Sequence, residues 1–124
     1  MRHFRLEDMV KGWFIGGFTP TAFSTRDCEV AVKQYKMGER EDLHYHKVAT
    51  EVTVVVLGCI RMLDRTWSAG DIIVLEPGVA TSFEALTDTM NVVVKLPGAL
   101  SDKYIGNPIS TSIDAAEEDL SSHV

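Results

Sequence analysis

The chain has 124 residues, a length typical of one domain, and 45% of them are hydrophobic while 24% are charged. This composition excludes an intrinsically disordered, collagen-like or coiled-coil chain. The formal net charge of −6 argues against nucleic acid as a partner, because contacts to phosphates require a basic surface. Only four histidines are present, so any site built from histidines must draw on His3, His44, His46 and His123.

The sequence predicts a cytoplasmic protein with no membrane partner. Its first residues carry charges where a signal peptide would need an apolar segment. No apolar run approaches the roughly 20 residues that a membrane-spanning helix needs. Cys28 and Cys59 lie far apart in the sequence and outside any C-x-x-C motif, which predicts two free thiols in a reducing compartment.

The first half of the chain reads mainly as short strands. Residues 5–10 are compatible with one helical turn, and the apolar residues 13–15 end at a Gly-Gly turn. Residues 28–36 alternate in the manner of a strand, and a polar turn follows from Gly38. The strongest strand signal covers residues 50–57 and ends at Gly58.

The second half continues the pattern, with strands predicted over residues 60–63, 72–75, 81–85 and 91–96. Short strands at about ten-residue spacing, without helical periodicity between them, indicate an antiparallel sandwich or barrel. Because Val54–Val56 is apolar at every position, we expect both faces of this strand to be covered. A second sheet or a partner subunit would provide that cover.

The C-terminal end has a different character. Its apolar residues fall at helical spacing, which predicts a short helix over residues 112–120, with a frayed tail as the alternative. Four acidic residues and no basic ones lie in this segment, so −6 for the chain less −4 for the tail leaves −2 for residues 1–109. We therefore divide the chain into a barrel domain, residues 1–109, and an acidic tail or short helix, residues 110–124.

One group of residues in the middle of the chain has the composition of a metal site. His44 and His46 are two positions apart, so on a strand both side chains point to the same side. Glu51 follows after a step long enough for a turn into the next strand. Two imidazoles and one carboxylate with open positions form an arrangement associated with non-haem iron, and zinc accepts the same ligands.

The spacing around these residues resembles the first signature motif of the cupin superfamily, G-x5-H-x-H-x4-E-x6-G. All its fixed positions are present, from Gly38 through His44, His46 and Glu51 to Gly58. Residues 67–78 resemble the opening of the second cupin motif, so the likeness covers nearly the whole barrel. The resemblance implies an all-β fold, an antiparallel jelly-roll barrel, and it implies a homodimer.

The second motif departs from the cupin pattern in one important place. The histidine that supplies the fourth metal ligand in cupins is replaced by Thr81. Since His3 and His123 are terminal, the barrel holds at most three ligands of the usual set. Two interpretations follow: a three-ligand site for divalent iron, manganese, nickel, copper or zinc, or a metal-free cluster of hydrogen-bonded polar side chains.

Further residues are candidates for the lining of the barrel. Thr53 and Val55 share the strand parity of Glu51, and Thr81 marks the fourth-ligand position. Arg61 and Lys95 have the charge to hold an anion, although exposed charges on a strand are the simpler interpretation. Two hypotheses for function remain: a metal-dependent oxygenase or isomerase acting on a small organic molecule, or a non-catalytic module that binds a small molecule or serves as a dimeric scaffold.

Overall fold

The computed structural model describes residues 1–108, and the helix predicted over 112–120 lies outside the described residues. A single 3₁₀ turn, η1 (Leu6–Asp8), precedes ten strands. The strands in chain order are β1 (Trp13–Ile15), β2 (Glu29–Tyr35), β3 (Arg40–Tyr45), β4 (Thr50–Leu57), β5 (Cys59–Met62), β6 (Arg65–Ser68), β7 (Ile72–Leu75), β8 (Thr81–Ala85), β9 (Thr89–Leu96) and β10 (Tyr104–Ile105).

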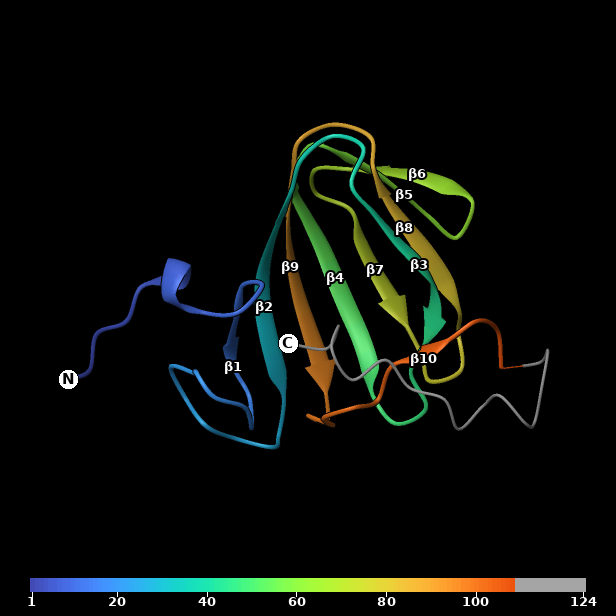
Figure 1. Cartoon of the computed structure of the whole chain (residues 1–124). Helices are drawn as coiled ribbons and strands as arrows, with labels where there is room; N and C mark the ends of the chain where they lie inside the picture. Colours follow the sequence, from blue (N-terminus) through green and yellow to red (C-terminus); the bar gives the residue numbers. More distant parts are fainter. Residues whose placement is uncertain (109–124) are drawn as a thin grey trace.

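The strands form two antiparallel five-stranded sheets, with the orders β1-β2-β9-β4-β7 and β10-β3-β8-β5-β6. In Figure 1 the first sheet runs from β1 to β7, and the strands of the second sheet lie beyond β7. Sequence neighbours such as β3 and β4 belong to different sheets, so the chain repeatedly crosses between the two layers. The prediction of an antiparallel all-β fold is confirmed.

Strand register decides which side chains meet inside the first sheet. Glu51 on β4 lies opposite Lys95 on β9, and Lys95 lies opposite Glu29 on β2. Directly paired residues point to the same face of a sheet, so these three charged side chains form one row. Glu29 and Lys95 are buried, which identifies this row as facing the interior.

Two apolar clusters pack the space between the layers. One consists of Val55, Ile60, Met62, Ile73, Leu75, Phe83 and Ala85, and the other of Trp13, Phe18, Ala31 and Val93. Members of both clusters also line a single cavity. The interior is therefore divided between packed apolar side chains and an open space bordered by them.

Two glycines of the cupin-like motif have left-handed backbone conformations, with φ of +92° at Gly38 and +87° at Gly58. Only glycine adopts this conformation without a steric cost. At Gly58 a Cβ atom would also lie 2.2 Å from the carbonyl oxygen of Asp88. Gly58 thus permits both the turn from β4 to β5 and the close approach of the turn before β9.

The structure bears on two expectations about the cellular setting. Both Cys28 and Cys59 are free thiols. Over residues 1–108, no helix is long and apolar enough to cross a membrane.

Candidate functional site

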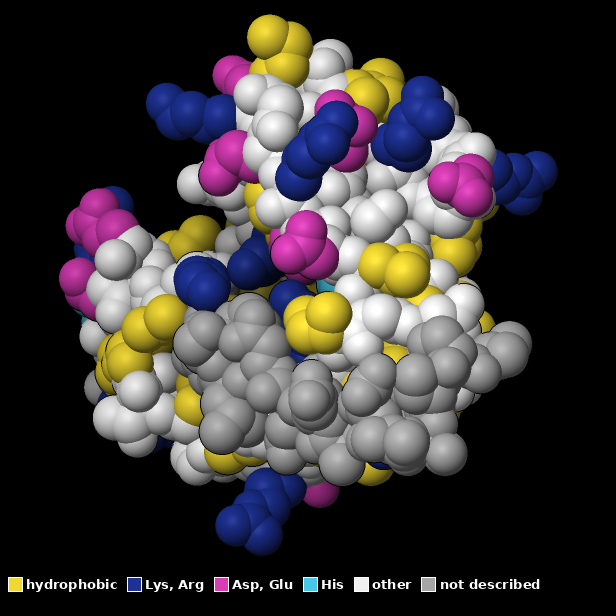
Figure 2. Space-filling view, turned by 45° about the vertical axis from the view of Figure 1, so that its right-hand side comes forward, with side chains coloured by type: hydrophobic (Ala, Val, Ile, Leu, Met, Phe, Trp, Pro, Cys, Tyr) yellow, Lys and Arg dark blue, Asp and Glu magenta, His cyan; other side chains and the backbone are white. Residues whose placement is uncertain are grey.

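The candidate site is a cavity of about 800 Å³ between the two sheets. Its lining comes from both sheets, from the N-terminal segment around η1 and from Lys103. Figure 2 looks onto the hollowed face, where Lys and Arg side chains gather and one histidine is visible in the recess. This volume is within the usual range for sites that bind small molecules.

His44 and His46 both line the cavity, and each is fixed by a hydrogen bond from its Nδ1 atom. His44 Nδ1 donates to the carbonyl oxygen of Asp42 at 2.8 Å, and His46 Nδ1 donates to the carbonyl oxygen of Asp102. A carbonyl oxygen only accepts, so both Nδ1 atoms carry a proton and donate it. Each Nε2 atom is left facing away from these bonds, and in a neutral imidazole it has the lone pair that can bind a metal or accept a proton.

Glu51 lies beside His46, near the start of β4. Its Oε1 atom is 3.4 Å from Nε2 of His46, yet Nε2 is buried and has no hydrogen-bond partner among the described residues. Burial alone would raise the pKa of Glu51, but His46 and Lys95 outweigh it and lower this pKa to about 2. Glu51 is thus a carboxylate at any physiological pH and lies beside the buried Nε2 atom of His46.

The donor set fits a divalent transition metal in its chemistry: two imidazole nitrogens and one carboxylate, with one buried nitrogen left without a partner. The positions of these side chains fit a bound metal less well than their chemistry does. The rings of His44 and His46 are nearly perpendicular, with centroids 5.6 Å apart. Within residues 1–108, no three His, Cys, Asp or Glu side chains converge closely enough to hold an ion as they stand. A metal would have to draw these side chains together.

Burial keeps His44 in its neutral form. Desolvation lowers the pKa of His44, and the nearby Lys103 ammonium lowers it further, while the carbonyl of Asp42 acts in the opposite direction. A neutral imidazole is the form that binds a metal, so the cavity wall provides the required protonation state.

Asp102 is the residue of the site that the sequence did not indicate. Its buried carboxylate accepts hydrogen bonds from the backbone N–H groups of three consecutive residues, Lys47, Val48 and Ala49, at 2.9 to 3.2 Å. Its carbonyl oxygen holds His46. One residue therefore fixes both the loop between β3 and β4 and the tautomer of His46.

The remaining predicted positions fall in different places. Thr81 lies opposite His44 on β8 and lines the cavity, but its hydroxyl donates to the Ser82 carbonyl at 2.7 Å and accepts from the Leu63 N–H at 3.0 Å. Thr53 also lines the cavity. Val55 instead belongs to the apolar core and is fully buried there. The Thr81 hydroxyl thus supports the backbone, which leaves it poorly placed to act as a ligand.

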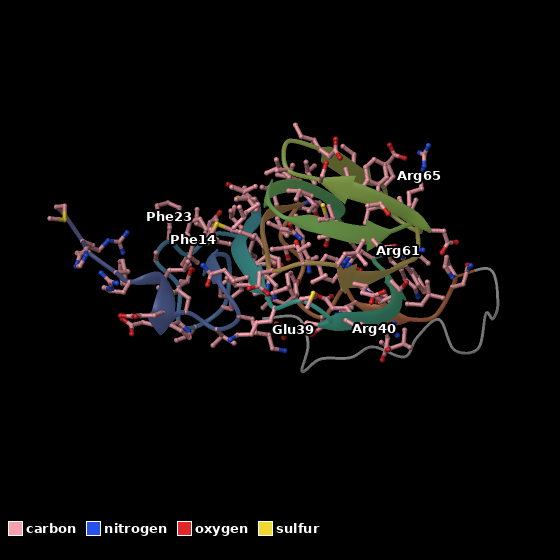
Figure 3. The ribbon with its side chains drawn as sticks, turned by 90° about the horizontal axis from the view of Figure 1, so that it is seen from above. Phe14, Phe23, Glu39, Arg40, Arg61 and Arg65 are labelled. Atoms are coloured by element: carbon pink, nitrogen blue, oxygen red, sulfur yellow. The ribbon has the colours of Figure 1, made fainter. Side chains whose placement is uncertain are left out.

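The expectation that Lys95 is an exposed strand charge is wrong. Lys95 is 4% exposed and lines the cavity, with its Nζ atom 4.7 Å from the centroid of the Trp13 ring. The apolar run that precedes Lys95 has valines on both faces, so alternation in the sequence could not show which side it faces. Arg61, by contrast, is exposed and does not line the cavity. Figure 3 places Arg61 and Arg65 on the β5–β6 hairpin, far from Phe14 and Phe23.

Glu41 is held by two other cavity residues. Its Oε2 atom accepts a 2.6 Å hydrogen bond from the Tyr35 hydroxyl, and its Oε1 atom is 3.6 Å from Nζ of Lys103. Burial would raise the pKa of Glu41, but these partners lower it overall, while burial and Glu41 together raise the pKa of Tyr35. Both oxygens of Glu41 are therefore engaged within the wall.

Comparison with known proteins identifies the fold. No family model matches the chain, and no curated protein matches it in sequence. Solved structures do match. A conserved double-stranded β-helix protein of Klebsiella pneumoniae has a TM-score of 0.59 and 20% identity, with 78% of this chain and 85% of that chain covered. The chain thus has the double-stranded β-helix fold that defines cupins, which confirms the resemblance at the level of fold.

Two further solved structures have the same fold. A cupin-2 domain protein of Shewanella frigidimarina has a TM-score of 0.51 and 20% identity over 58% of this chain and 72% of its own. Oxalate decarboxylase of Bacillus subtilis has a TM-score of 0.55 and 20% identity over 64% of this chain and 24% of its own. At sequence identities this low, a structural match shows the fold alone. The function must therefore be argued from the site.

Proposed function

We propose that this protein binds one divalent transition metal through His44, His46 and Glu51, and a small organic molecule in the adjoining cavity. The observation that carries the proposal is the buried Nε2 atom of His46, which has no hydrogen-bond partner among the described residues and faces the Glu51 carboxylate. Leaving a buried polar nitrogen without a hydrogen bond is costly, and a cation bound by its neutral form would relieve that cost.

In this proposal, a bound metal would act as a Lewis acid toward an oxygen atom of the organic molecule, or a redox-active metal would activate dioxygen. The protein's own residues do the remaining work. The carbonyls of Asp42 and Asp102 orient the two imidazoles, and members of the two apolar clusters provide apolar surface on the cavity wall for the organic molecule. An oxygenase or isomerase reaction would use these features, and one solved structural neighbour is an oxalate decarboxylase.

The second candidate is a metal-free binding module, and one observation favours it. The three predicted ligands do not converge closely enough to hold an ion as they stand, and His46 and Glu51 already form an ion pair when His46 is protonated. In that case the same cavity would bind an organic molecule without chemistry, or the barrel would serve as a dimeric scaffold.

Elemental analysis separates the two candidates. Protein purified without a histidine tag and then loaded with iron, manganese, nickel, copper or zinc should retain close to one equivalent of at least one metal per chain. His46→Ala and Glu51→Gln should reduce retention to background, and His3→Ala, at the exposed N-terminal end, should not. Retention below about a tenth of an equivalent for every metal would overturn the metal proposal and leave the binding module.

We further propose a cytoplasmic homodimer that forms through the outer face of the first sheet. The free thiols support the reducing compartment. Outward positions on β2, β9, β4 and β7 carry no charged residue, and exposed ones include Val56, Ile72, Val74 and Leu96. An uncharged apolar face is complementary to itself, so a second copy related by a two-fold axis fits it.

Charge placed on this face should dissociate the dimer. Val74→Glu puts like charges on both copies within the proposed contact, so we expect a change from dimer to monomer in sedimentation equilibrium at micromolar concentration. Ser82→Glu, at an exposed position on β8 in the second sheet, serves as a charge-matched control away from the proposed contact. A wild-type chain that is monomeric across the same concentrations would contradict the proposal.

A further inference from the structure

We propose that the organic molecule in the cavity is a carboxylate, with its acid group held between Lys33 and Lys95 in front of Trp13. This inference deepens the proposed function, because it names the chemical class of the cavity ligand. It depends on the cavity binding a small molecule, but it does not depend on a metal being present.

The first argument is the position of the two ammonium groups. Lys33 on β2 and Lys95 on β9 both line the cavity, and their Nζ atoms lie 5.8 Å and 4.7 Å from the centroid of the same Trp13 ring. Lys33 is also 5.9 Å from the centroid of the Tyr35 ring. Each ammonium thus lies close to the same indole ring on the cavity wall, where a cation is stabilised by the ring and can meet an anionic ligand.

The second argument is that neither of these two ammonium groups forms an ion pair within the described part of the chain. In the described part of the chain, neither Nζ atom lies within 4.0 Å of a carboxylate oxygen. Glu41 is engaged by Tyr35 and Lys103 instead. Glu51 and Glu29 attract Lys95 only over longer distances. A buried ammonium needs hydrogen-bond acceptors as well as a favourable potential, and a ligand carboxylate would provide both.

Burial makes this lack of acceptors costly. Lys95 is 4% exposed, and desolvation is the largest influence on both lysines, lowering the pKa of each. Each ammonium carries three N–H donors. The aromatic rings of the wall compensate part of the charge, but they accept no ordinary hydrogen bond. Lys95 thus lines the cavity with a side chain that is largely removed from bulk solvent.

The third argument is the charge of the cavity as a whole. Its lining contains six basic side chains, Arg5, Lys11, Lys33, Arg40, Lys95 and Lys103, against four acidic ones, Glu7, Glu39, Glu41 and Glu51. The chain itself has a net charge of −6. A cavity with an excess of two positive charges in an acidic protein concentrates anions rather than cations, and Figure 2 shows basic side chains gathered in the recess.

The surroundings favour an organic acid over inorganic phosphate. Trp13, Tyr35 and Phe83 line the cavity with aromatic surface, which an inorganic ion would leave uncovered. A carboxylate attached to an apolar body satisfies both the lysines and the rings.

Calorimetry on metal-free protein tests the inference. The probes are acetate, succinate, benzoate and phthalate, each paired with its neutral amide, together with inorganic phosphate. At least one acid should bind, its amide should bind at least about tenfold more weakly, and phosphate should bind more weakly than that acid. Failure of every acid, or equal affinity of acid and amide, would overturn the inference.

Variants assign the binding to the two lysines. Lys33→Met and Lys95→Met keep side-chain length and should each weaken the acid about tenfold or more, while Lys36→Met, exposed at the end of β2, should not. If Lys95→Met does not fold, Lys95→Arg and Lys33→Met still decide the question, because Arg retains the charge. Unchanged affinity in Lys33→Met would contradict the inference. Metal content is measured separately, so its loss is distinguishable from loss of acid binding.

Discussion

Replacing Asp102 with alanine should lower the free energy of unfolding by about 3 kcal/mol, because hydrogen bonds to a charged group contribute about 1.5 to 3 kcal/mol each. The carboxylate accepts N–H groups of Lys47, Val48 and Ala49. Water can replace it at the exposed Lys47 and Val48, but Ala49 is only 1% exposed. Urea denaturation of the variant and the wild type measures the difference.

Asp42→Ala is the matched control. The carbonyl of Asp42 also holds a histidine Nδ1, but Asp42 itself is exposed, so this change should alter stability by less than about 0.5 kcal/mol. Asp102→Asn should fall between the two, since its amide retains an oxygen acceptor but presents N–H to another N–H. Equal stability of the Asp102→Ala and Asp42→Ala variants would show that the loop between β3 and β4 does not depend on this carboxylate.

Glu51 should make the stability of the metal-free protein depend on pH in the acid range. Its folded-state pKa of about 2 lies below the 4.5 of an unperturbed glutamate, so the unfolded chain binds the proton first as the pH falls. The stabilisation is complete above pH 4.5 and is lost as the pH falls toward 2. At about 1.4 kcal/mol for each pKa unit, the loss is about 3 kcal/mol.

The measurement compares the wild type with Glu51→Gln in denaturation series between pH 6 and pH 2. The wild type should be more stable at pH 6, and its advantage should shrink as the pH falls. Glu76→Gln, an exposed position after β7, should leave the pH dependence parallel to that of the wild type. A constant difference between the wild type and Glu51→Gln across the series would contradict a lowered pKa for Glu51.

Much of the fold could be predicted because its strands have strong local signals. Residues 50–57, 72–75 and 81–85 were predicted as strands with the bounds that the structure has. Their β-branched residues favour extended backbone, and the Gly and Pro residues around them end each strand. His44, His46 and Glu51 are likewise close together in the sequence, so a local motif was enough to predict that the three residues share one cavity wall.

The rest of the site could not be predicted because it depends on distant pairings. Asp102 contacts residues that lie 53 to 55 positions earlier in the sequence, and nothing near it indicates a buried carboxylate. The inward direction of Lys95 follows from its register with Glu51 and Glu29, which local alternation does not specify. The short strands β1 and β10 are likewise defined mainly by the strands they pair with.

The position of Asp102 in the chain has a consequence for synthesis. Both histidines and Glu51 leave the ribosome about fifty residues before the carbonyl that orients His46. A nascent chain that already exposes these three side chains has neither the fixed tautomer nor the shaped loop. For the proposed metal site, specific loading would therefore follow completion of the barrel, and a metal taken up earlier would be held by an unfolded chain without selectivity.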